Sequence, residues 1–154
     1  MAGNALNNSD AQLELRFGTM ADAHAAAEIE LRRRALAEPL GLPVEAVRFE
    51  FEARSLHLWA LLDEVLIGCV LFYRDNERGG RLYQMAVEPS LQNSGVGRLL
   101  VQRLETRLRE LGVHEVRLHA RGPSVGFYAK LGYAAYDAPF FEVGIEHRHM
   151  RREL

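Results

Sequence analysis

Residues 81–111 (RLYQMAVEPSLQNSGVGRLLVQRLETRLREL) predict a β-strand, a loop and an α-helix in direct succession, and this unit constrains the fold most strongly. The short apolar run 82–87 is rich in strand-forming residues, and Pro89 cannot continue a hydrogen-bonded ladder, so the strand should end just before it. Beyond the loop, apolar residues recur every three or four positions across 96–111, which predicts a helix of about four turns. Gly112 should end that helix.

The loop in this unit, residues 92–98, can bind an anion. It contains Gly95 and Gly97 and leads into a helix N-terminus, where free N–H groups and the positive end of the helix dipole favour a pyrophosphate. Arg98 would add a full positive charge. The chain has no G-x-x-x-x-G-K-[ST] sequence, which excludes a P-loop, and its G-x-G without a third glycine is a poor dinucleotide fingerprint.

Two motifs instead carry a resemblance to a known family. Gln92, Gly95 and Gly97, which follow a V-x-P sequence, match the acyl-CoA loop pattern [Gln/Arg]-x-x-Gly-x-[Gly/Ala]. Downstream, the segment 126–133 (GFYAKLGY) is similar to F-Y-x-K-x-G-[Phe/Tyr]. On these residues the chain resembles the GNAT (Gcn5-related N-acetyltransferase) superfamily. Its C-terminal segment 141–150 is also similar to strands common among small bacterial members.

The resemblance covers roughly residues 13–154 and implies an α/β (α+β) fold. A mixed, mostly antiparallel sheet of six to seven strands should be flanked by about four helices and splayed between the fourth and fifth strands. The order β-α-β-β-β-α-β-α-β-β also follows from hydrophobic periodicity and turn residues alone. Strands are expected at 13–17, 56–62, 65–73, 82–88, 113–120, 140–145 and 147–152, and helices at 23–36, 96–111 and 125–131, with a short helical turn at 44–47. Expected caps and turns are Thr19 or Asp22 before the first helix, Ser124 before the last, and a tight hairpin at Asp63-Glu64.

Composition narrows the class of protein further. We expect residues 1–12 to form a disordered tail and residues 13–154 a single domain, because 154 residues with 48% hydrophobic content suffice for one core. A net charge of −2 gives no pull toward nucleic acid or an anionic membrane. The absence of a signal peptide favours a cytoplasmic location. With one cysteine, Cys69, we expect neither a disulfide nor a metal site, and Cys69 itself reads as a core residue.

The resemblance implies acetyl-CoA as the co-substrate. The backbone of a splayed strand would hold its pantetheine arm, and the loop would hold its pyrophosphate. Arg121 stands where many relatives carry an asparagine, and it could bind the 3′-phosphate or adenine side instead. Lys130 either reaches a phosphate or is solvated. The expected cofactor-binding residues are Met85, Ala86, Val87, Gln92, Asn93, Ser94, Gly95, Val96, Gly97, Arg98, Arg121, Phe127, Tyr128 and Lys130.

Acyl transfer from a thioester to an amine needs a donor to the oxyanion and a proton for the departing thiolate. The resemblance assigns the proton to Tyr128, since a phenol with a pKa of ~10 is protonated at neutral pH. The alternative is that Tyr128 is an aromatic residue of the core with a solvated hydroxyl. Phe127 already supplies a buried ring at this place, which favours the catalytic role for Tyr128. For the oxyanion the resemblance points to the backbone N–H of Ala86 or Val87.

The general base is the least determined part of the mechanism. Gln84 stands where many relatives carry a glutamate, and an amide cannot accept a proton at neutral pH. Gln84 could therefore only orient a water. The candidate bases are Glu88, His57, His119 and His147, unless the amine has a low pKa and needs none.

The acceptor is predicted to be the primary amine of a small molecule, which attacks the thioester of acetyl-CoA directly. Arg32-Arg33-Arg34 reads as a solvated face, or one arginine faces a substrate carboxylate or phosphate. Glu45, Glu50 and Glu52 read as a solvated acidic loop, or as contacts to a cationic acceptor. The alternatives are a protein N-acetyltransferase and a catalytically silent module that binds or senses acyl-CoA. The resemblance allows a homodimer as well as a monomer.

Overall fold

The computed structural model describes residues 12–154, so the expected tail lies outside the described residues except for Gln12. Seven strands form one sheet in the order β1-β2-β3-β4-β5-β7-β6. All neighbours pair antiparallel except β4 and β5, which are parallel. The strands are β1 (Leu13–Gly18), β2 (Leu56–Leu62), β3 (Val65–Arg74), β4 (Gly79–Val87), β5 (Glu115–Arg121), β6 (Ala134–Glu142) and β7 (Ile145–Glu153). The predicted fold class and element order are confirmed.

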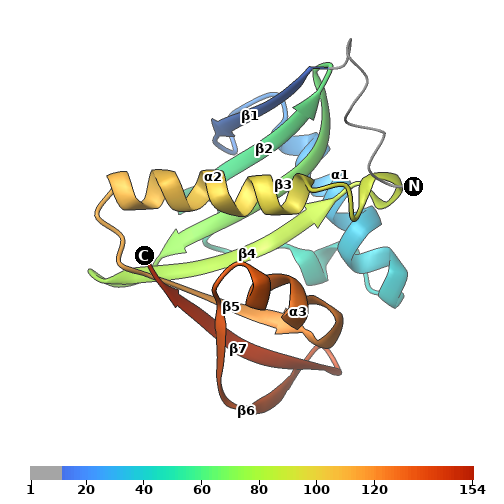
Figure 1. The fold of residues 1–154 in the computed structure, drawn as a ribbon. Coiled ribbons are helices and arrows are strands. Elements are labelled where there is room, and N and C mark those ends of the chain that lie inside the picture. The colour runs from blue at the N-terminus through green and yellow to red at the C-terminus, as the bar shows by residue number, and fades with distance from the viewer. Residues whose placement is uncertain (1–11) are drawn as a thin grey trace.

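Helices cover both faces of the sheet. The α-helices are α1 (Ala25–Arg32), α2 (Val96–Glu110) and α3 (Gly122–Lys130), and a π-helical turn, η2 (Arg33–Ala37), continues α1. Helices α2 and α3 lie on one face, with α1 on the other (Figure 1). The remaining helical turns are η3 (Glu38–Leu40), η4 (Val44–Val47), η5 (Glu52–Arg54) and η6 (Pro89–Leu91).

Two apolar layers hold the helices to the sheet. The apolar stripe of α2, which includes Val96, Leu100, Leu104 and Leu108, is buried against the strands, as its spacing predicts. A smaller layer lies under α1 and contains Cys69, which is fully buried as expected. Each face of the sheet is therefore covered.

The two predicted helix caps are wrong. Helix α1 begins at Ala25 without a side-chain cap. Asp22 instead accepts hydrogen bonds from the backbone N–H of Thr19, at 2.7 Å, and from its hydroxyl, at 3.2 Å, which closes the turn before the helix. Helix α3 begins at Gly122, because Pro123 fits a first helical turn, where its missing N–H has no partner to lose. Ser124 therefore lies inside the helix.

The hairpin turns follow local sequence. Asp63 and Glu64, between β2 and β3, have φ of 49° and 67°, so the predicted tight turn is confirmed. The predicted strand at 140–145 has the wrong bounds. Strand β6 begins at Ala134 and ends at Glu142, because Val143 and Gly144 form the turn into β7 with φ of 48° and 73°.

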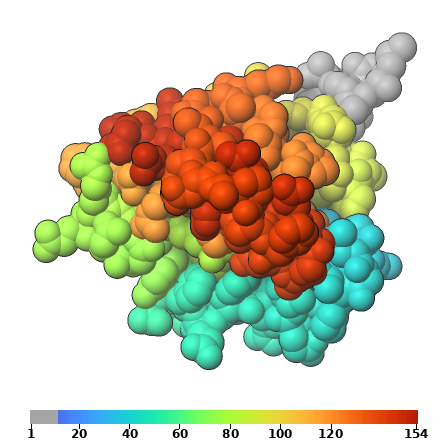
Figure 2. Space-filling view, turned by 90° about the horizontal axis from the view of Figure 1, so that it is seen from below, coloured from blue at the N-terminus to red at the C-terminus, as the bar shows by residue number. Residues whose placement is uncertain are grey.

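Strands β4 and β5 separate soon after they meet, which confirms the predicted splay (Figure 1). They pair only from Gly79 and Glu115 to Arg81 and Arg117, so the β5-facing edge of residues 82–87 has no strand partner. Seen from below, the β6–β7 hairpin lies beside segment 38–55 (Figure 2).

A bulge lies in the open half of β4. Cys69 pairs with Ala86 and Leu71 pairs with Tyr83, so β4 has one residue more than β3 at this point. Within the bulge, Gln84 has a φ of 50°. A bulge increases the local twist of a strand, which turns β4 away from β5.

Candidate active site

The loop after β4 presents an uncapped helix N-terminus. Gly95 precedes α2 with a φ of 95°, a conformation that L-residues rarely adopt, and no side chain caps the helix. The N–H groups of the first turn of α2 are thus free to bind an anion. Arg98 is exposed in the same turn.

Gly97 lies where α2, α3 and β4 meet. A Cβ atom there would lie 3.3 Å from Cζ of Phe127 and 3.9 Å from Cγ2 of Val87. The two glycines of the motif therefore have different roles. Gly95 permits a positive φ, while Gly97 permits close packing against α3.

Two polar side chains of the loop stabilise the loop itself. The Gln92 amide donates to the Val87 carbonyl at 3.3 Å, and the Ser94 hydroxyl donates to the Leu91 carbonyl. Asn93 contributes a left-handed residue with a φ of 63°. These contacts connect the loop to the open end of β4, which contains Met85, Ala86 and Val87.

Tyr128 lies in the core, not on its edge. Its ring is 6% exposed and packs edge-to-face against Phe127 at 4.9 Å and Tyr133 at 5.7 Å. Phe127 is only partly buried, so the expectation that Phe127 supplies the buried ring is wrong. The Tyr128 hydroxyl makes no hydrogen bond to any residue in the range 12–154. Burial raises the pKa of Tyr128 well above its usual value, which keeps the phenol protonated at neutral pH.

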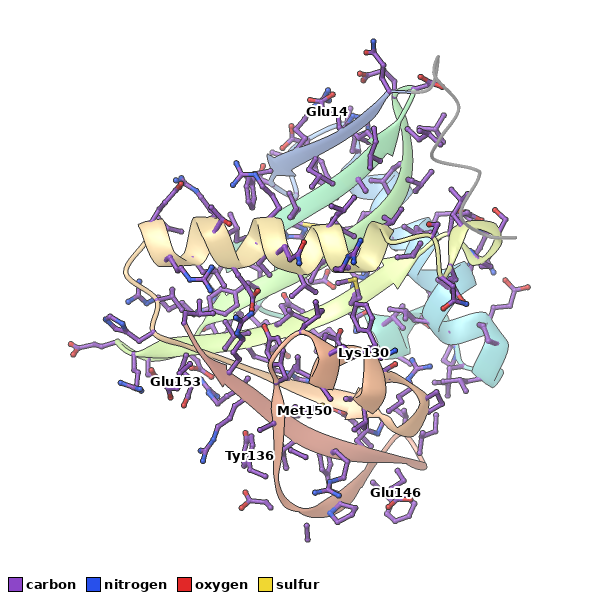
Figure 3. The ribbon with its side chains drawn as sticks, viewed as in Figure 1. Glu14, Lys130, Tyr136, Glu146, Met150 and Glu153 are labelled. Carbon is purple, nitrogen blue, oxygen red and sulfur yellow. The ribbon has the colours of Figure 1, made fainter. Side chains whose placement is uncertain are left out.

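The remaining predicted cofactor residues lie around α3. Arg121 donates to the Leu36 carbonyl at 3.3 Å, so its guanidinium bridges β5 and η2. Burial lowers the pKa of Arg121. Lys130 is exposed at the end of α3 (Figure 3).

The candidate catalytic residues Gln84, in β4, and Glu88, directly after it, differ in their contacts. The Gln84 side-chain oxygen is buried and accepts no hydrogen bond from the described residues. The Glu88 carboxylate accepts a hydrogen bond from Arg34 at 2.6 Å. Glu88 is therefore engaged by η2, whereas Gln84 keeps a free acceptor.

His57 belongs to a buried ion network under α1. Its Nδ1 lies 2.8 Å from a Glu28 carboxylate oxygen and its Nε2 lies 2.8 Å from the Glu52 carbonyl oxygen. Both partners only accept, so both ring nitrogens donate and the ring is charged. Burial opposes the charged ring, but the Glu28 carboxylate outweighs it and raises the pKa of His57. With no free lone pair, His57 cannot act as a base.

The same network corrects two expectations from the sequence. Arg32 is fully buried and bonds to Glu28 and Glu52, so it is not part of a solvated face. Glu52 is 5% exposed and is used by Arg32, whereas Glu45 and Glu50 are exposed. Of Glu45, Glu50 and Glu52, only Glu45 and Glu50 remain solvated.

A second polar cluster lies on the α1 face of β5, β6 and β7. The Glu142 carboxylate lies 3.3 Å from Nδ1 of His119, 3.8 Å from Nε2 of His147 and 3.7 Å from the Arg81 guanidinium. The hydrogen bond with His119 helps to lower the pKa of Glu142 to about 2. Sequence reasoning missed Glu142 and Arg81, because only the pairing of β4 with β5, of β5 with β7 and of β7 with β6 brings them to the histidines.

Residues 29–154, most of the chain, match the acetyltransferase (GNAT) domain family. The chain belongs to the GNAT superfamily.

The chain is also similar to individual proteins and to solved structures. The chain is 30% identical over 135 residues to a Bacillus subtilis (strain 168) protein described as "Putative acetyltransferase", covering 86% of this chain and 90% of that protein. Escherichia coli ElaA has the same fold, with a TM-score of 0.80 at 18% identity over 92% of this chain and 100% of ElaA. A GNAT acetyltransferase from Elizabethkingia anophelis, solved with acetyl-CoA bound, gives a TM-score of 0.69 at 18% identity over 92% of this chain and 98% of that one.

No described helix is both long and apolar enough to cross a membrane. No group of three or more histidine, cysteine or acidic side chains in the described part of the chain is placed to hold a metal ion.

Proposed function

We propose that this GNAT protein is an acetyl-CoA-dependent N-acetyltransferase that transfers an acetyl group to the primary amine of a small molecule by direct attack. One observation carries the proposal. The unpaired edge of β4 leads directly into the uncapped N-terminus of α2, and α3, which holds Tyr128, packs against that junction at Gly97. The related Elizabethkingia protein, solved with acetyl-CoA, supports this co-substrate.

The described residues fit acetyl-CoA. The first-turn N–H groups of α2 and the Arg98 guanidinium would bind the pyrophosphate. The free backbone groups of 85–87 would bind the pantetheine arm, and the buried, unpartnered oxygen of Gln84 would accept an N–H from the bound molecules. Acetyl-CoA would supply an activated acyl group.

Three groups of the chain would then act on the reaction. A backbone N–H at Ala86 or Val87 would stabilise the oxyanion. Tyr128, protonated and without another hydrogen-bond partner, would donate a proton to the leaving sulfur. His119 is our choice of base, because Glu142 holds its Nδ1 and leaves the lone pair on Nε2 free.

Replacing Tyr128 with phenylalanine tests this function. Free-thiol release with a panel of amines should fall by about 10- to 10⁴-fold. Binding of acetyl-CoA should persist in this variant and can be measured as a rise in melting temperature. Saturation at about 100 times Kd adds about 2.7 kcal/mol of stability, which raises the melting temperature by roughly 5 to 11 °C.

Tyr136→Phe, on β6 (Figure 3), is the matched control, since Tyr136 stacks on His149 and has no part in the proposed reaction. Its transfer rate should equal that of the unaltered protein. Acetyl-CoA stabilisation without thiol release from any amine would instead identify a silent acyl-CoA-binding module.

A further inference from the structure

Arg81 has no hydrogen-bond partner among the described residues, although most of its side chain is buried. The side chain is 24% exposed, and its Nε is shut off from solvent. The nearest acid, Glu142, lies 3.7 Å from the guanidinium, which is too far for a hydrogen bond. Buried polar groups in folded proteins almost always have partners, so the buried Nε requires an acceptor from elsewhere.

Two other arginines with a buried, unpartnered Nε differ from Arg81. Arg32 donates from both terminal nitrogens to Glu28, Glu52 and a backbone carbonyl. Arg148 donates to the Asp137 carbonyl at 3.3 Å. Within residues 12–154, only Arg81 of these three leaves its whole planar fork unused.

Arg81 lies at the closed end of the splay, where β4 and β5 begin to separate. It is the last residue of β4 that pairs with β5, and its guanidinium lies 5.9 Å from the centre of the Phe49 ring. Phe49 packs edge-to-face against Tyr83 at 5.4 Å. Figure 2 shows segment 38–55, which contains Phe49, beside the β6–β7 hairpin, which contains Glu142. Arg81 thus lies between the two segments that border the open half of β4.

The acids around Arg81 leave its donors unused. Glu142 shares its one negative charge with His119 and His147 as well as with Arg81. The other nearby acids already have partners, since Glu88 pairs with Arg34, Glu52 with Arg32, and both Asp75 and Glu115 with Arg117. No carboxylate of the described residues therefore lies within hydrogen-bond distance of Arg81, and that place is open to an anion of the acceptor.

We infer that the acceptor carries an anionic group, a carboxylate or a phosphate, which Arg81 binds through its fork. This rests on the function proposed above. Planar guanidinium groups bind both kinds of anion through two parallel hydrogen bonds. The acceptor's amine then lies near Ala86, where the oxyanion would form. Ala86 is five residues beyond Arg81 along β4, a distance of roughly 16 Å at about 3.3 Å per residue. An acceptor that reaches both sites keeps its amine and its anion several bonds apart, as in an ω-amino acid or an amino sugar phosphate, and unlike an α-amino acid.

The test measures acetyl transfer to matched pairs of amines. 6-Aminohexanoate is compared with hexylamine to test for a carboxylate on the acceptor. Glucosamine 6-phosphate is compared with glucosamine to test for a phosphate. Glycine serves as the α-amino acid. The anionic member of at least one pair should have the higher kcat/KM. Arg81→Met should raise KM for that substrate by roughly 10- to 100-fold, because it loses a charge-assisted contact, while kcat/KM for the neutral amine stays the same.

Arg78→Met is the matched control, since Arg78 is 60% exposed and pairs with Glu153 at the surface. It should change neither substrate's KM. Equal use of neutral and anionic amines, or equal losses for both in Arg81→Met, would overturn this inference and leave the acetyltransferase intact. Transfer to no amine in the panel would overturn both.

Discussion

Replacement of Arg32 by methionine tests how strongly the buried ions under α1 stabilise the fold. Arg32 donates to Glu28 at 3.1 Å and also to Glu52 and the Val47 carbonyl, and its side chain is fully buried. Methionine replaces the aliphatic stem of arginine but has no guanidinium and no charge. The variant therefore leaves Glu52 without its ion-pair partner in the interior.

Removing one partner of a buried ion pair costs about 3–5 kcal/mol, because the remaining charge is uncompensated. With an m-value of about 2 kcal/mol/M, the urea midpoint should fall by about 1.5–2.5 M. The adjacent Arg33 is the matched control. Its side chain is 39% exposed and pairs with Glu30 at 2.7 Å, so Arg33→Met should cost at most about 1 kcal/mol.

Circular dichroism during urea unfolding measures both variants. If Arg32→Met fails to fold, Arg32→Lys replaces it, since lysine keeps the charge but loses the fork. The urea midpoint of Arg32→Lys should lie between that of the unaltered protein and the midpoint expected for Arg32→Met. A cost for Arg32→Met no greater than for Arg33→Met would refute the claim that the network stabilises the fold.

Four more outcomes follow from the structure. The pKa of His57 is higher in the folded protein than its value of about 6.5 in the unfolded chain, so its charge contributes stability that is complete below a pH of about 6.5. This stability is lost as the pH rises through the pKa of the folded state. The urea midpoint should therefore fall less with rising pH in His57→Gln than in the unaltered protein. Glu64→Gly should stabilise by about 0.5–1 kcal/mol, because the left-handed φ of 67° suits glycine; an unchanged midpoint would contradict this. Gly95→Ala and Gly112→Ala should each cost about 1–2 kcal/mol at their φ of 95° and 75°, but only the first should reduce the melting shift caused by acetyl-CoA. The Cys69 thiol, whose pKa burial raises, should react with a thiol reagent only after unfolding, and rapid labelling of the folded protein would show that it is not buried.

Local sequence predicted the parts of the fold that depend on neighbouring residues. The Asp63-Glu64 turn and the apolar stripe of α2 depend on backbone preferences and on period, which act over a few positions. The Gly95 and Gly97 pattern likewise located the loop that leads into the uncapped N-terminus of α2. The predicted caps failed because Pro123 and a local turn at Asp22 offered alternatives of similar energy.

Predictions about burial and pairing failed where distant segments meet. The triplet 32–34 shows no sign in its sequence that its first arginine is buried, since Glu52 approaches from a separate segment. His57 looked like a possible base until its two partners were known. Glu142 and Arg81 are sixty-one positions apart and meet only through the sheet.

The sequence by itself determined the family and the order of the elements, because these depend on periodicity and on two short motifs. Only the tertiary structure decided which charged side chains neutralise one another and which remain available. His57 and Arg32 form buried ion pairs with Glu28 and Glu52, while the Arg81 donors have no hydrogen-bond acceptor among the described residues. The physical reason is that the state of an ionisable side chain depends on burial and on partners supplied by other segments, which local sequence does not encode.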